Sequence, residues 1–590
     1  MKVSRRQRSF FPAVAEIRQY SRQNLPDDLV AGLMTAVLLI PQALAYAALA
    51  GLPVEVGLYA SILPPVVYAL MGTSRTLSIG PVALSALLVA NALSGTAELP
   101  GSPAYVADAL LLAALSGLIF LAMALLRLDV LVNFIGHPVL SGFTTAAAIL
   151  IIIGQIPSLV GVDVAAAGSG LDKVAATAEH LFELHLKTTL VGLASLALLL
   201  LLRTPLVTAL ERLGLSNKLA GLASRTGPLV VIVVLTVLVA NFNLDREGVA
   251  IVGAVPAGLP IPSLDFLRLE RISALLPSAF IISLIGYVGS ISVAKSLAHR
   301  RRERVDNNQE LVALGFSNIA ASLSGSMPVA GGFSRSSVNF AAGAQTQLSA
   351  VIGSILVAAA ALYFTPLFYY LPKAALAATI VVSVLSLLDW KAARDAWHYD
   401  RADGTAWVMT FLGVLAVNIE VGLLAGVLVG LGSFIWRSSR PHMAIVGRVP
   451  GTEHFRNVQR HGVQTWPNLM LLRVDRSLFF ANINYVGDEV ARVASEQSEL
   501  EHLVIICSAV NTIDHSALEA LELMALNLRE AGITLHLAEV KGPVMDRLKH
   551  TDFEEQLAPG RIFLSTDGAV HALTSFVASN TLEDETEQSG

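Results

Sequence analysis

Hydrophobic runs separated by short polar breaks fill the chain from about residue 28 to residue 436. The apolar core of a bilayer is about 30 Å thick and needs roughly 20 apolar residues per helix. Long parts of the chain therefore predict membrane-spanning helices, singly or in pairs. Stretches without any Asp, Glu, Lys or Arg include residues 29–54, 109–126, 130–162, 188–202, 226–244, 272–294, 336–372 and 421–436.

The character of the sequence changes once, near Trp436, after which charged residues become as frequent as in a soluble domain. We predict a cytoplasmic N-terminal arm at residues 1–27, a transmembrane domain at 28–437, a second domain at 443–578 and a disordered acidic tail at 579–590. The first apolar run is too long for a signal peptide, so we expect it to be retained as the first helix.

The positions of Lys and Arg predict the orientation, because these residues concentrate in cytoplasmic loops. We expect the cytoplasmic side to hold the N-terminal arm and residues 203–225, 300–304, 391–401 and 437–440, and the opposite side to hold 156–186 and 244–271. About 14 segments, with both termini inside, satisfy these assignments. Glu55, Asp108 and Glu420 fall near predicted segment ends, where we expect solvated side chains.

Two short segments, third and tenth in this count, interrupt the hydrophobic pattern with Gly and Pro. Residues 78–85 (SIGPVALS) lead into a short helix to about residue 92, and residues 328–337 (PVAGGFSRSS) lead into another to about residue 344. Paired interrupted segments at matching places in two halves indicate the central binding site of a transporter. Because each is third in a set of seven, we predict an α-helical polytopic membrane fold of two inverted seven-helix repeats.

A helix that starts inside a membrane leaves its first backbone amides unpaired, and these amides together with the helix dipole favour an anion. We expect Pro81 in the first turn of the first short helix, where its missing N–H costs nothing. Arg335 is the only charged residue between residues 311 and 372, and such an isolated charge indicates a functional site. The candidate anion-binding residues are Gln42, Tyr46, Gly80, Val82, Ala83, Phe333, Ser334 and Arg335.

Alternative interpretations of these motifs are structural. The Gly-Pro pair can simply kink a helix, Arg335 can pair with a lipid phosphate, and Tyr46 can serve in packing. His137-Pro138 with Ser141 can form a polar pivot in the fifth helix, but a helix kink is the favoured interpretation. The co-occurrence of the two interrupted segments favours the functional interpretation.

Composition excludes several other classes of protein. Of the 590 residues, 54% are hydrophobic and only 14% are charged, whereas soluble domains carry about 25% charged residues. A net charge of −5 without a basic patch makes nucleic acid an unexpected partner, and the single cysteine, Cys507, excludes a disulfide framework. No catalytic motif occurs in a convincing context, so we predict no enzyme, no cofactor and no metal site.

Five sequence strings in the same order resemble the sulfate permease (SulP) family of anion transporters. They are residues 39–46 (LIPQALAY), 72–75 (GTSR), 78–83 (SIGPVA), 137–143 (HPVLSGF) and 331–336 (GGFSRS). The resemblance implies a 14-segment fold, shared with nucleobase permeases, in which a core (segments 1–4 and 8–11) moves against a gate. It also implies an anion site between the third and tenth half-helices, lined by Gln42, Tyr46, Val82, Ser334 and Arg335.

One position departs from this family. Many bacterial members carry a carboxylate where this chain has Gly289, and that acid is implicated in coupling to protons or sodium. Its absence leaves exchange, uncoupled movement or an acid elsewhere as alternatives, and it argues against a nucleobase permease.

The sequence of the second domain predicts alternating strands and helices, which indicate a small α/β sandwich. We expect strands at residues 469–474, 503–507 and 533–538, and helices near 484–494, 516–530 and 544–549. Residues 508–518 (SAVNTIDHSAL) resemble the loop of STAS domains in which the serine matching Ser516 is phosphorylated. The structural alternative is that Ser516 and Glu519 form a capping box, and a partner-docking or homodimer role for the domain is favoured. Cys507 is expected in the core.

The predicted function is secondary active anion transport, with sulfate as the leading substrate, in the bacterial inner membrane. Bicarbonate and C4-dicarboxylates are alternative substrates. A membrane-anchored STAS regulator with vestigial transport and an anion channel are alternative functions. Expected partners are the anion, membrane lipid, a coupling proton or sodium ion, a second copy of the chain and a cytoplasmic partner of the STAS domain.

Overall fold

The structure is a computed structural model that describes residues 11–94, 98–129, 136–162, 178–180, 184–203, 217–260, 262 and 264–574. It divides into two compact units, Met1–Gly430 and Leu431–Gly590. The first ten residues and the predicted acidic tail at 579–590 lie outside the described residues.

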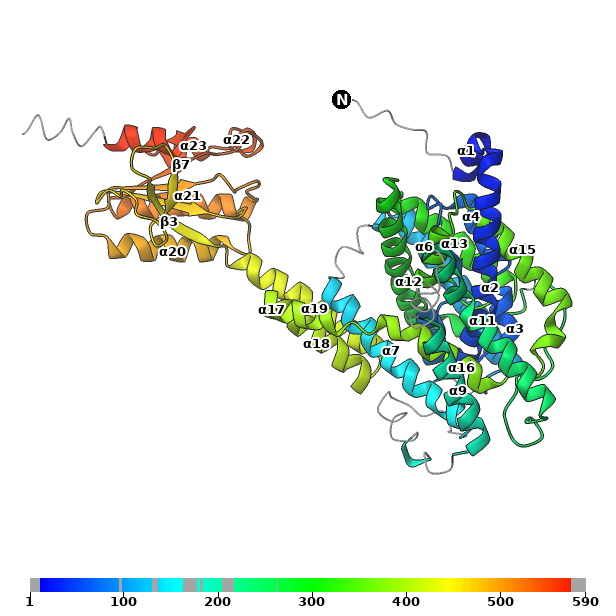
Figure 1. The fold of residues 1–590 in the computed structure, drawn as a ribbon. Coiled ribbons are helices and arrows are strands. Elements are labelled where there is room, and N and C mark those ends of the chain that lie inside the picture. Colours follow the sequence, from blue (N-terminus) through cyan, green and yellow to red (C-terminus); the bar gives the residue numbers. More distant parts are fainter. Residues whose placement is uncertain are drawn as a thin grey trace, which may run out of the picture. The chain divides into compact units, whose positions relative to one another are not determined.

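The first unit is a helical bundle in which one series of elements occurs twice (Figure 1). In each series, helices are followed by a two-residue strand, a short helix and another long helix. The first series comprises α1 (Pro12–Gln19), α2 (Leu25–Leu49), α3 (Val54–Tyr59), α4 (Leu63–Met71), β1 (Ile79–Gly80), α5 (Ala83–Ser94) and α6 (Pro103–Leu125). The second comprises α12 (Ile272–Arg301), α13 (Asn307–Leu323), β2 (Ala330–Gly331), α14 (Phe333–Ala341) and α15 (Leu348–Tyr363).

Helices that follow each series complete this unit. They are α7 (His137–Val160), α9 (Leu186–Arg203) and α11 (Asn217–Asn241) after the first, and α16 (Lys373–Val384), α17 (Trp390–Tyr399), α18 (Arg401–Ala416) and α19 (Ile419–Ser439) after the second. Helix α2 packs on α15, and α12 packs on α6. In each pair, an early helix of one series packs on the last helix of the other series, as expected for two related halves.

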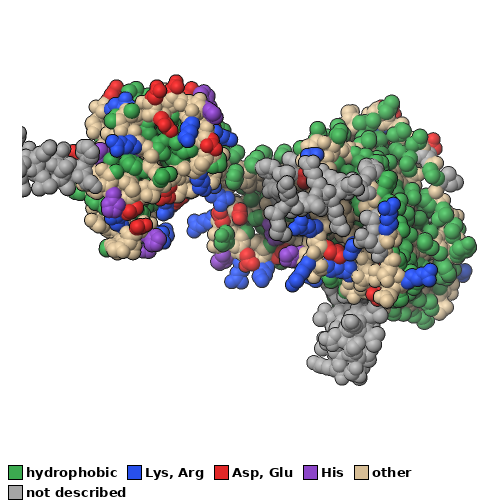
Figure 2. Space-filling view, turned by 90° about the horizontal axis from the view of Figure 1, so that it is seen from above, with side chains coloured by type: hydrophobic (Ala, Val, Ile, Leu, Met, Phe, Trp, Pro, Cys, Tyr) green, Lys and Arg blue, Asp and Glu red, His purple; other side chains and the backbone are tan. Residues whose placement is uncertain are grey.

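Seven helices among the described residues are long and apolar enough to cross a membrane, and four shorter apolar helices accompany them. The prediction of about 14 segments remains a prediction. Apolar side chains such as Leu193, Ile355 and Leu424 face outward, and the surface of this unit is mainly hydrophobic with few charges (Figure 2). Such a surface suits contact with lipid rather than water.

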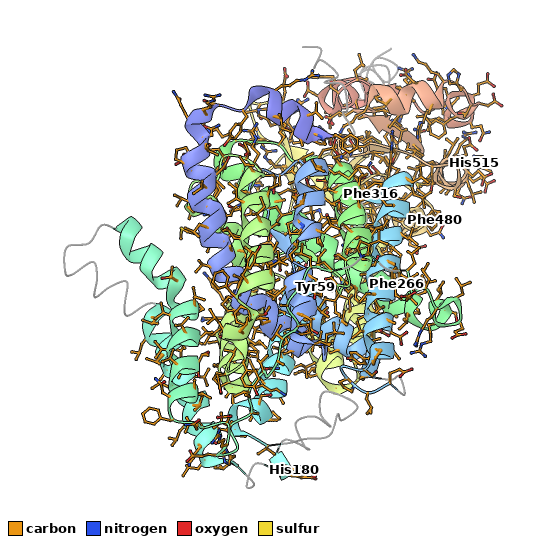
Figure 3. All side chains as sticks on the ribbon, turned by 90° about the vertical axis from the view of Figure 1, so that its right-hand side faces the viewer. Tyr59, His180, Phe266, Phe316, Phe480 and His515 are labelled. Carbon is orange, nitrogen blue, oxygen red and sulfur yellow. The ribbon has the colours of Figure 1, made fainter. Side chains whose placement is uncertain are left out.

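Small residues bring the helices of the bundle close together. A Cβ added to Gly117 of α6 would lie 2.8 Å from the carbonyl oxygen of Gly315 in α13. Small side chains at helix contacts are the usual means of close packing in membranes. Larger side chains fill the remaining space between helices (Figure 3).

Asp108 of α6 is not solvated as predicted, and this prediction is wrong. Its side chain is 0% exposed and accepts hydrogen bonds from Nη2 (2.7 Å) and Nε (3.2 Å) of Arg271. Burial of a charge requires such a partner, and the partner lies 163 residues further along the chain.

The second unit contains a six-stranded sheet of order β4-β3-β5-β6-β7-β8. Strands β5 to β8 run parallel, and β3 is antiparallel to both of its neighbours. The strands are β3 (Met443–Arg448), β4 (Phe455–Asn457), β5 (Leu469–Val474), β6 (His502–Ile506), β7 (Thr534–Ala538) and β8 (Ile562–Phe563). The helices are α20 (Ile483–Glu496), α21 (His515–Glu530), α22 (Gly542–Leu548) and α23 (Phe553–Leu557).

Alternation of side chains along the strands builds a core on each face of this sheet. Leu503 and Ile505 of β6 pack in the cluster that includes α20 and α21. Val504 and Ile506 pack with residues 569–573 in the other cluster. Because successive side chains of a strand point to opposite faces, a strand that is apolar at every position is covered on both sides. The predicted strands and helices appear close to their expected bounds, while β3, β4, β8 and α23 were not predicted.

Candidate functional site

The two interrupted segments meet at a short antiparallel sheet inside the first unit. Ile79 pairs with Gly331 and Gly80 with Ala330, and the N–H of Gly332 donates to the carbonyl of Ser78 (3.0 Å). Each strand runs directly into a short helix, so α5 and α14 begin side by side with opposite directions. Two helix N-termini, with their unpaired first amides, therefore converge on one place.

Pro81 does not occupy the first turn of α5, and the prediction that it does is wrong. The helix begins at Ala83, and the N–H of Ala86 bonds to the carbonyl of Val82 (3.0 Å). Pro81 precedes the helix, and its carbonyl oxygen accepts a hydrogen bond from Nη1 of Arg335 (2.6 Å).

Arg335 lies in the first turn of α14 and is 2% exposed. Its Nη1 reaches across to the start of α5, but its Nε and Nη2 have no hydrogen-bond partner among the described residues. Glycines make room for the guanidinium, since a Cβ on Gly332 would lie 2.9 Å from Cζ and one on Gly80 would lie 3.3 Å from Nη2. A buried cation with unused donors favours an anionic ligand.

A cavity of about 460 Å³ lies against these helix ends. Seven of the eight candidate residues line it, and they are Gln42, Tyr46, Val82, Ala83, Phe333, Ser334 and Arg335. The eighth, Gly80, is not part of the wall and lies behind Arg335. The structure thus brings together residues that are up to 293 positions apart in the sequence.

Several polar residues of the cavity wall were not predicted. They come mainly from α7, α12, the end of α16 and the turn after it, and they are Ser85, His137, Ser141, Thr144, Ser292, Ser383, Ser386 and Asp389. The recurrence of Ser and Thr within apolar helices is the feature of the sequence that could have identified them. The expected kink at His137-Pro138 is wrong, because Gly136 precedes α7 and Pro138 lies in its first turn, where proline is favourable.

Gly289 also lines the cavity, and a Cβ placed on it would meet nothing within 4 Å. There is space for a larger side chain at this position. Asp389 is the only carboxylate among the described residues of the cavity wall.

A second hollow of about 530 Å³ shares His137 and Asp389 with the cavity. Its other charged residues are Lys391, Asp395 and Asp403. These lie in and beside the segment 391–401, for which the sequence predicts a cytoplasmic position. The two hollows are therefore neighbours that share part of their walls.

Buried side chains fasten the backbone around β1 and β2. Asn318 donates to the carbonyl of Val329 (3.0 Å) and accepts from its N–H (2.9 Å). The hydroxyl of Ser290 accepts from the N–H of Gly331 (2.8 Å), and that of Ser336 from the N–H of Ser78 (2.9 Å). These bonds satisfy backbone groups that a two-residue strand leaves unpaired.

In the second unit, Ser516 does not cap α21 as the capping-box interpretation expects. The cap is Asp514, whose Oδ1 accepts from the N–H of Ala517 (2.9 Å) and whose Oδ2 accepts from the N–H of Phe480 (2.9 Å). Phe480 and His515 both lie at this end of the unit (Figure 3). Ser516 is exposed beside them.

Cys507 is buried, as predicted, and burial raises the pKa of its thiol to about 12.

The described residues contain no group of three His, Cys, Asp or Glu side chains that could hold a metal ion.

The fold and the site define a multi-pass membrane protein in which two broken helices meet at a central cavity, joined to a separate sheet-and-helix domain. The chain belongs to the Sulfate permease family, whose profile matches residues 25–410, and the STAS domain profile matches residues 460–569.

Named relatives match nearly the whole chain. Sulfate transporter 4.1, chloroplastic, of Arabidopsis thaliana is 34% identical over 589 residues, which are 98% of this chain and 84% of that protein. High affinity sulfate transporter 2 of Stylosanthes hamata is 31% identical over 576 residues, which are 95% and 86% of the two chains.

Solved structures share the fold at lower identity. Murine Solute Carrier 26 family member A9, an anion transporter in the inward-facing state, superposes with a TM-score of 0.85 at 22% identity, covering 96% of this chain and 94% of that one. The transmembrane domain of a cyanobacterium bicarbonate transporter gives a TM-score of 0.58 at 23% identity, covering 69% and 98%. The two likenesses establish the helical membrane fold.

Proposed function

We propose that this protein is a secondary active transporter of sulfate that holds the anion between the N-termini of α5 and α14. The observation that carries the proposal is Arg335, a buried cation with two donor nitrogens that lack a partner among the described residues. Hydrogen bonds from charged donors contribute about 1.5–3 kcal/mol each, so an anion placed here is held strongly. The names of the relatives favour sulfate over bicarbonate and C4-dicarboxylates.

The cavity wall suggests how the site changes sides. Helices α2, α5, α12 and α14 supply one part of the wall, and α7 and α16 supply the other. We place the first group in the moving core and the second in the gate. Sliding of one against the other exposes the same site to each side in turn.

The second hollow supports an orientation for this conformation. Its residues Lys391 and Asp395 belong to a segment that Lys and Arg assign to the cytoplasm. On this basis we propose that the protein faces inward here. We also propose that it lies in the cell (inner) membrane with both termini in the cytoplasm and works as a homodimer, as the resemblance to the family implies. Its STAS domain offers a docking surface to a cytoplasmic partner, and phosphorylation of exposed Ser516 would act there.

Uptake into liposomes tests the function. Purified full-length protein should accumulate labelled sulfate faster than bicarbonate or fumarate, and imposed proton or sodium gradients should identify the coupling ion. Absence of gradient-sensitive uptake of every anion would contradict transport.

The same assay tests the site. Arg335→Ala should raise the KM for sulfate at least tenfold, because the lost guanidinium supplied charged donors worth about 1.5–3 kcal/mol. Arg492→Ala is a control, since Arg492 is an exposed STAS residue paired with Glu489 and Glu496. An unchanged KM in Arg335→Ala would remove Arg335 from the site.

A further inference from the structure

Two buried carboxylates outside the cavity hold loops that flank the half-helices. Glu310, in the first turn of α13, is 1% exposed. Its Oε1 accepts from the N–H of Thr73 (2.7 Å), the hydroxyl of Thr73 (2.6 Å) and the N–H of Ser74 (3.2 Å). Its Oε2 accepts from the hydroxyl of Tyr68 (2.6 Å).

Asp28 repeats this arrangement in the other half. It lies in the first turn of α2 and is 0% exposed. Its Oδ1 accepts from the N–H groups of Gln345 (2.7 Å) and Thr346 (3.0 Å), and its Oδ2 from the hydroxyls of Thr346 (2.7 Å) and Tyr20 (3.3 Å). Each carboxylate thus receives two consecutive backbone N–H groups, one threonine hydroxyl and one tyrosine hydroxyl.

Each carboxylate comes from one half of the bundle and holds a loop of the other half. Thr73 and Ser74 precede β1, whereas Gln345 and Thr346 follow α14. The amide of Gln347 joins the two loops, because its Nε2 donates to the carbonyls of Ser74 (2.6 Å) and Leu77 (2.9 Å).

The held loops determine where the anion-binding groups lie. The backbone from Ser74 to Ser78 runs straight into β1 and then to Pro81, whose carbonyl anchors Arg335. The amide of Asn339, in α14 itself, donates to the carbonyl of Thr76 (3.1 Å). An ionised carboxylate only accepts hydrogen bonds, so four donors satisfy it, whereas an amide in its place accepts through one oxygen only and turns N–H groups towards the hydroxyl that the second oxygen had bound.

We propose that Glu310 and Asp28 are positioning residues for anion binding, which fix the spacing of the two half-helices and thereby the aim of Arg335 and of the first amides of α5 and α14. This inference rests on the proposed function. It assigns both carboxylates an effect on affinity although neither contacts the cavity.

The test is sulfate uptake by full-length Glu310→Gln and Asp28→Asn proteins in liposomes, together with the melting temperature of each purified protein. We expect the KM for sulfate to rise at least fivefold in Glu310→Gln and at least threefold in Asp28→Asn, with maximal rates per folded protein within twofold of the unchanged chain. Asp108→Asn is the matched control. It removes an equally buried carboxylate, bonded to Arg271 away from both loops, and should lower the melting temperature while leaving KM within twofold.

A second pair of variants covers the case in which Glu310→Gln does not fold. Thr73→Val loses the hydroxyl that donates to Glu310 and that also accepts from the N–H of Asp306 (3.2 Å), and it should raise KM at least twofold. Thr73→Ser keeps the hydroxyl and should leave KM unchanged. Wild-type KM in Glu310→Gln, or in Thr73→Val, would overturn the positioning role and leave sulfate transport standing. Absence of sulfate uptake by the unchanged chain would instead overturn the proposed function.

Discussion

Arg335 and Asp389 are the charged side chains of the cavity wall that bear most directly on its chemistry. Arg335 is buried and lies beside two glycines, whereas Asp389 is exposed where the cavity meets the second hollow. Asp389 lies in the wall of both hollows, and its negative charge repels a nearby anion. We predict that anion movement is coupled to protons through this carboxylate.

Asp389→Asn should therefore reduce the stimulation of sulfate uptake by an inward proton gradient to less than half. Asparagine caps a helix about as well as aspartate, so the bond from the N–H of Ala392 to this cap of α17 (2.9 Å) is kept. Initial uptake rates with and without the gradient measure the effect. Asp395→Asn, confined to the second hollow, serves as control, and full stimulation in Asp389→Asn would rule out this role.

Buried His536, with half-buried His502 beside it, is expected to make the second unit sensitive to acid. His536 is 2% exposed, its Nδ1 accepts from the N–H of Arg561 (3.1 Å), and its Nε2 lies 3.3 Å from Nδ1 of His502. Burial, with nearby His502 and Arg561, lowers the pKa of His536 to about 4. The pKa of histidine in an unfolded chain is near 6.5. Between pH 4 and pH 6.5, His536 is therefore protonated in the unfolded state and neutral in the folded state.

Stability of the STAS domain should therefore fall as the pH falls from about 6.5 towards 4. The expected loss between pH 7 and pH 5 is about 2 kcal/mol. Hydrogen exchange of β6 and β7 in the full chain, corrected for the intrinsic pH dependence of exchange, measures it. His536→Gln should lose less than half as much, and an equal loss in this variant would show that another group is responsible.

At the scale of elements, the start of α21 depends on Asp514 rather than on Ser516. One carboxylate caps the helix and also accepts from the N–H of Phe480, which lies in the loop between β5 and α20. The sequence pattern Ser-x-x-Glu is therefore present at Ser516 without acting as the cap.

Asp514→Ala should destabilise α21 by about 1–2 kcal/mol, because the cap and a second backbone bond are lost. Ser516→Ala should change stability by less than about 0.5 kcal/mol, as exposed substitutions usually do. Hydrogen exchange of α21 compares the two variants. A larger effect of Ser516→Ala would restore the capping-box interpretation.

At the scale of the whole molecule, the proposed inward-facing state can be probed with thiol reagents. The chain has one cysteine, Cys507, which is buried and whose pKa is raised to about 12 by that burial. Thiolates are the reactive form, so the unmodified chain should not be labelled. Labelling of a single cysteine introduced into the cavity can then be measured without background from Cys507.

Ser386→Cys should react with a membrane-impermeant maleimide applied from the side that bears the STAS domain, and sulfate should slow the reaction at least threefold. Vesicles of opposite orientation supply the comparison. Arg394→Cys, outside both hollows and exposed on α17 in the segment predicted to be cytoplasmic, controls for a general effect of sulfate on labelling. Reaction from the opposite side alone would reverse the proposed orientation.

The sequence by itself determined the membrane bundle, the separate α/β domain, the two interrupted segments and seven residues of the cavity wall. It succeeded because exclusion of charge, Gly-Pro breaks and alternating strands are local consequences of solvent and backbone geometry. The isolated charge of Arg335 was visible for the same reason.

Only the tertiary structure decided which distant groups meet. In the structure Asp108 pairs with Arg271, and Pro81 lies before its helix and accepts from Arg335. Ser383 and Asp389 line the cavity, and Glu310 binds the loop at Thr73. None of these contacts leaves a periodic mark, because a buried polar group requires a partner without specifying where in the chain that partner lies.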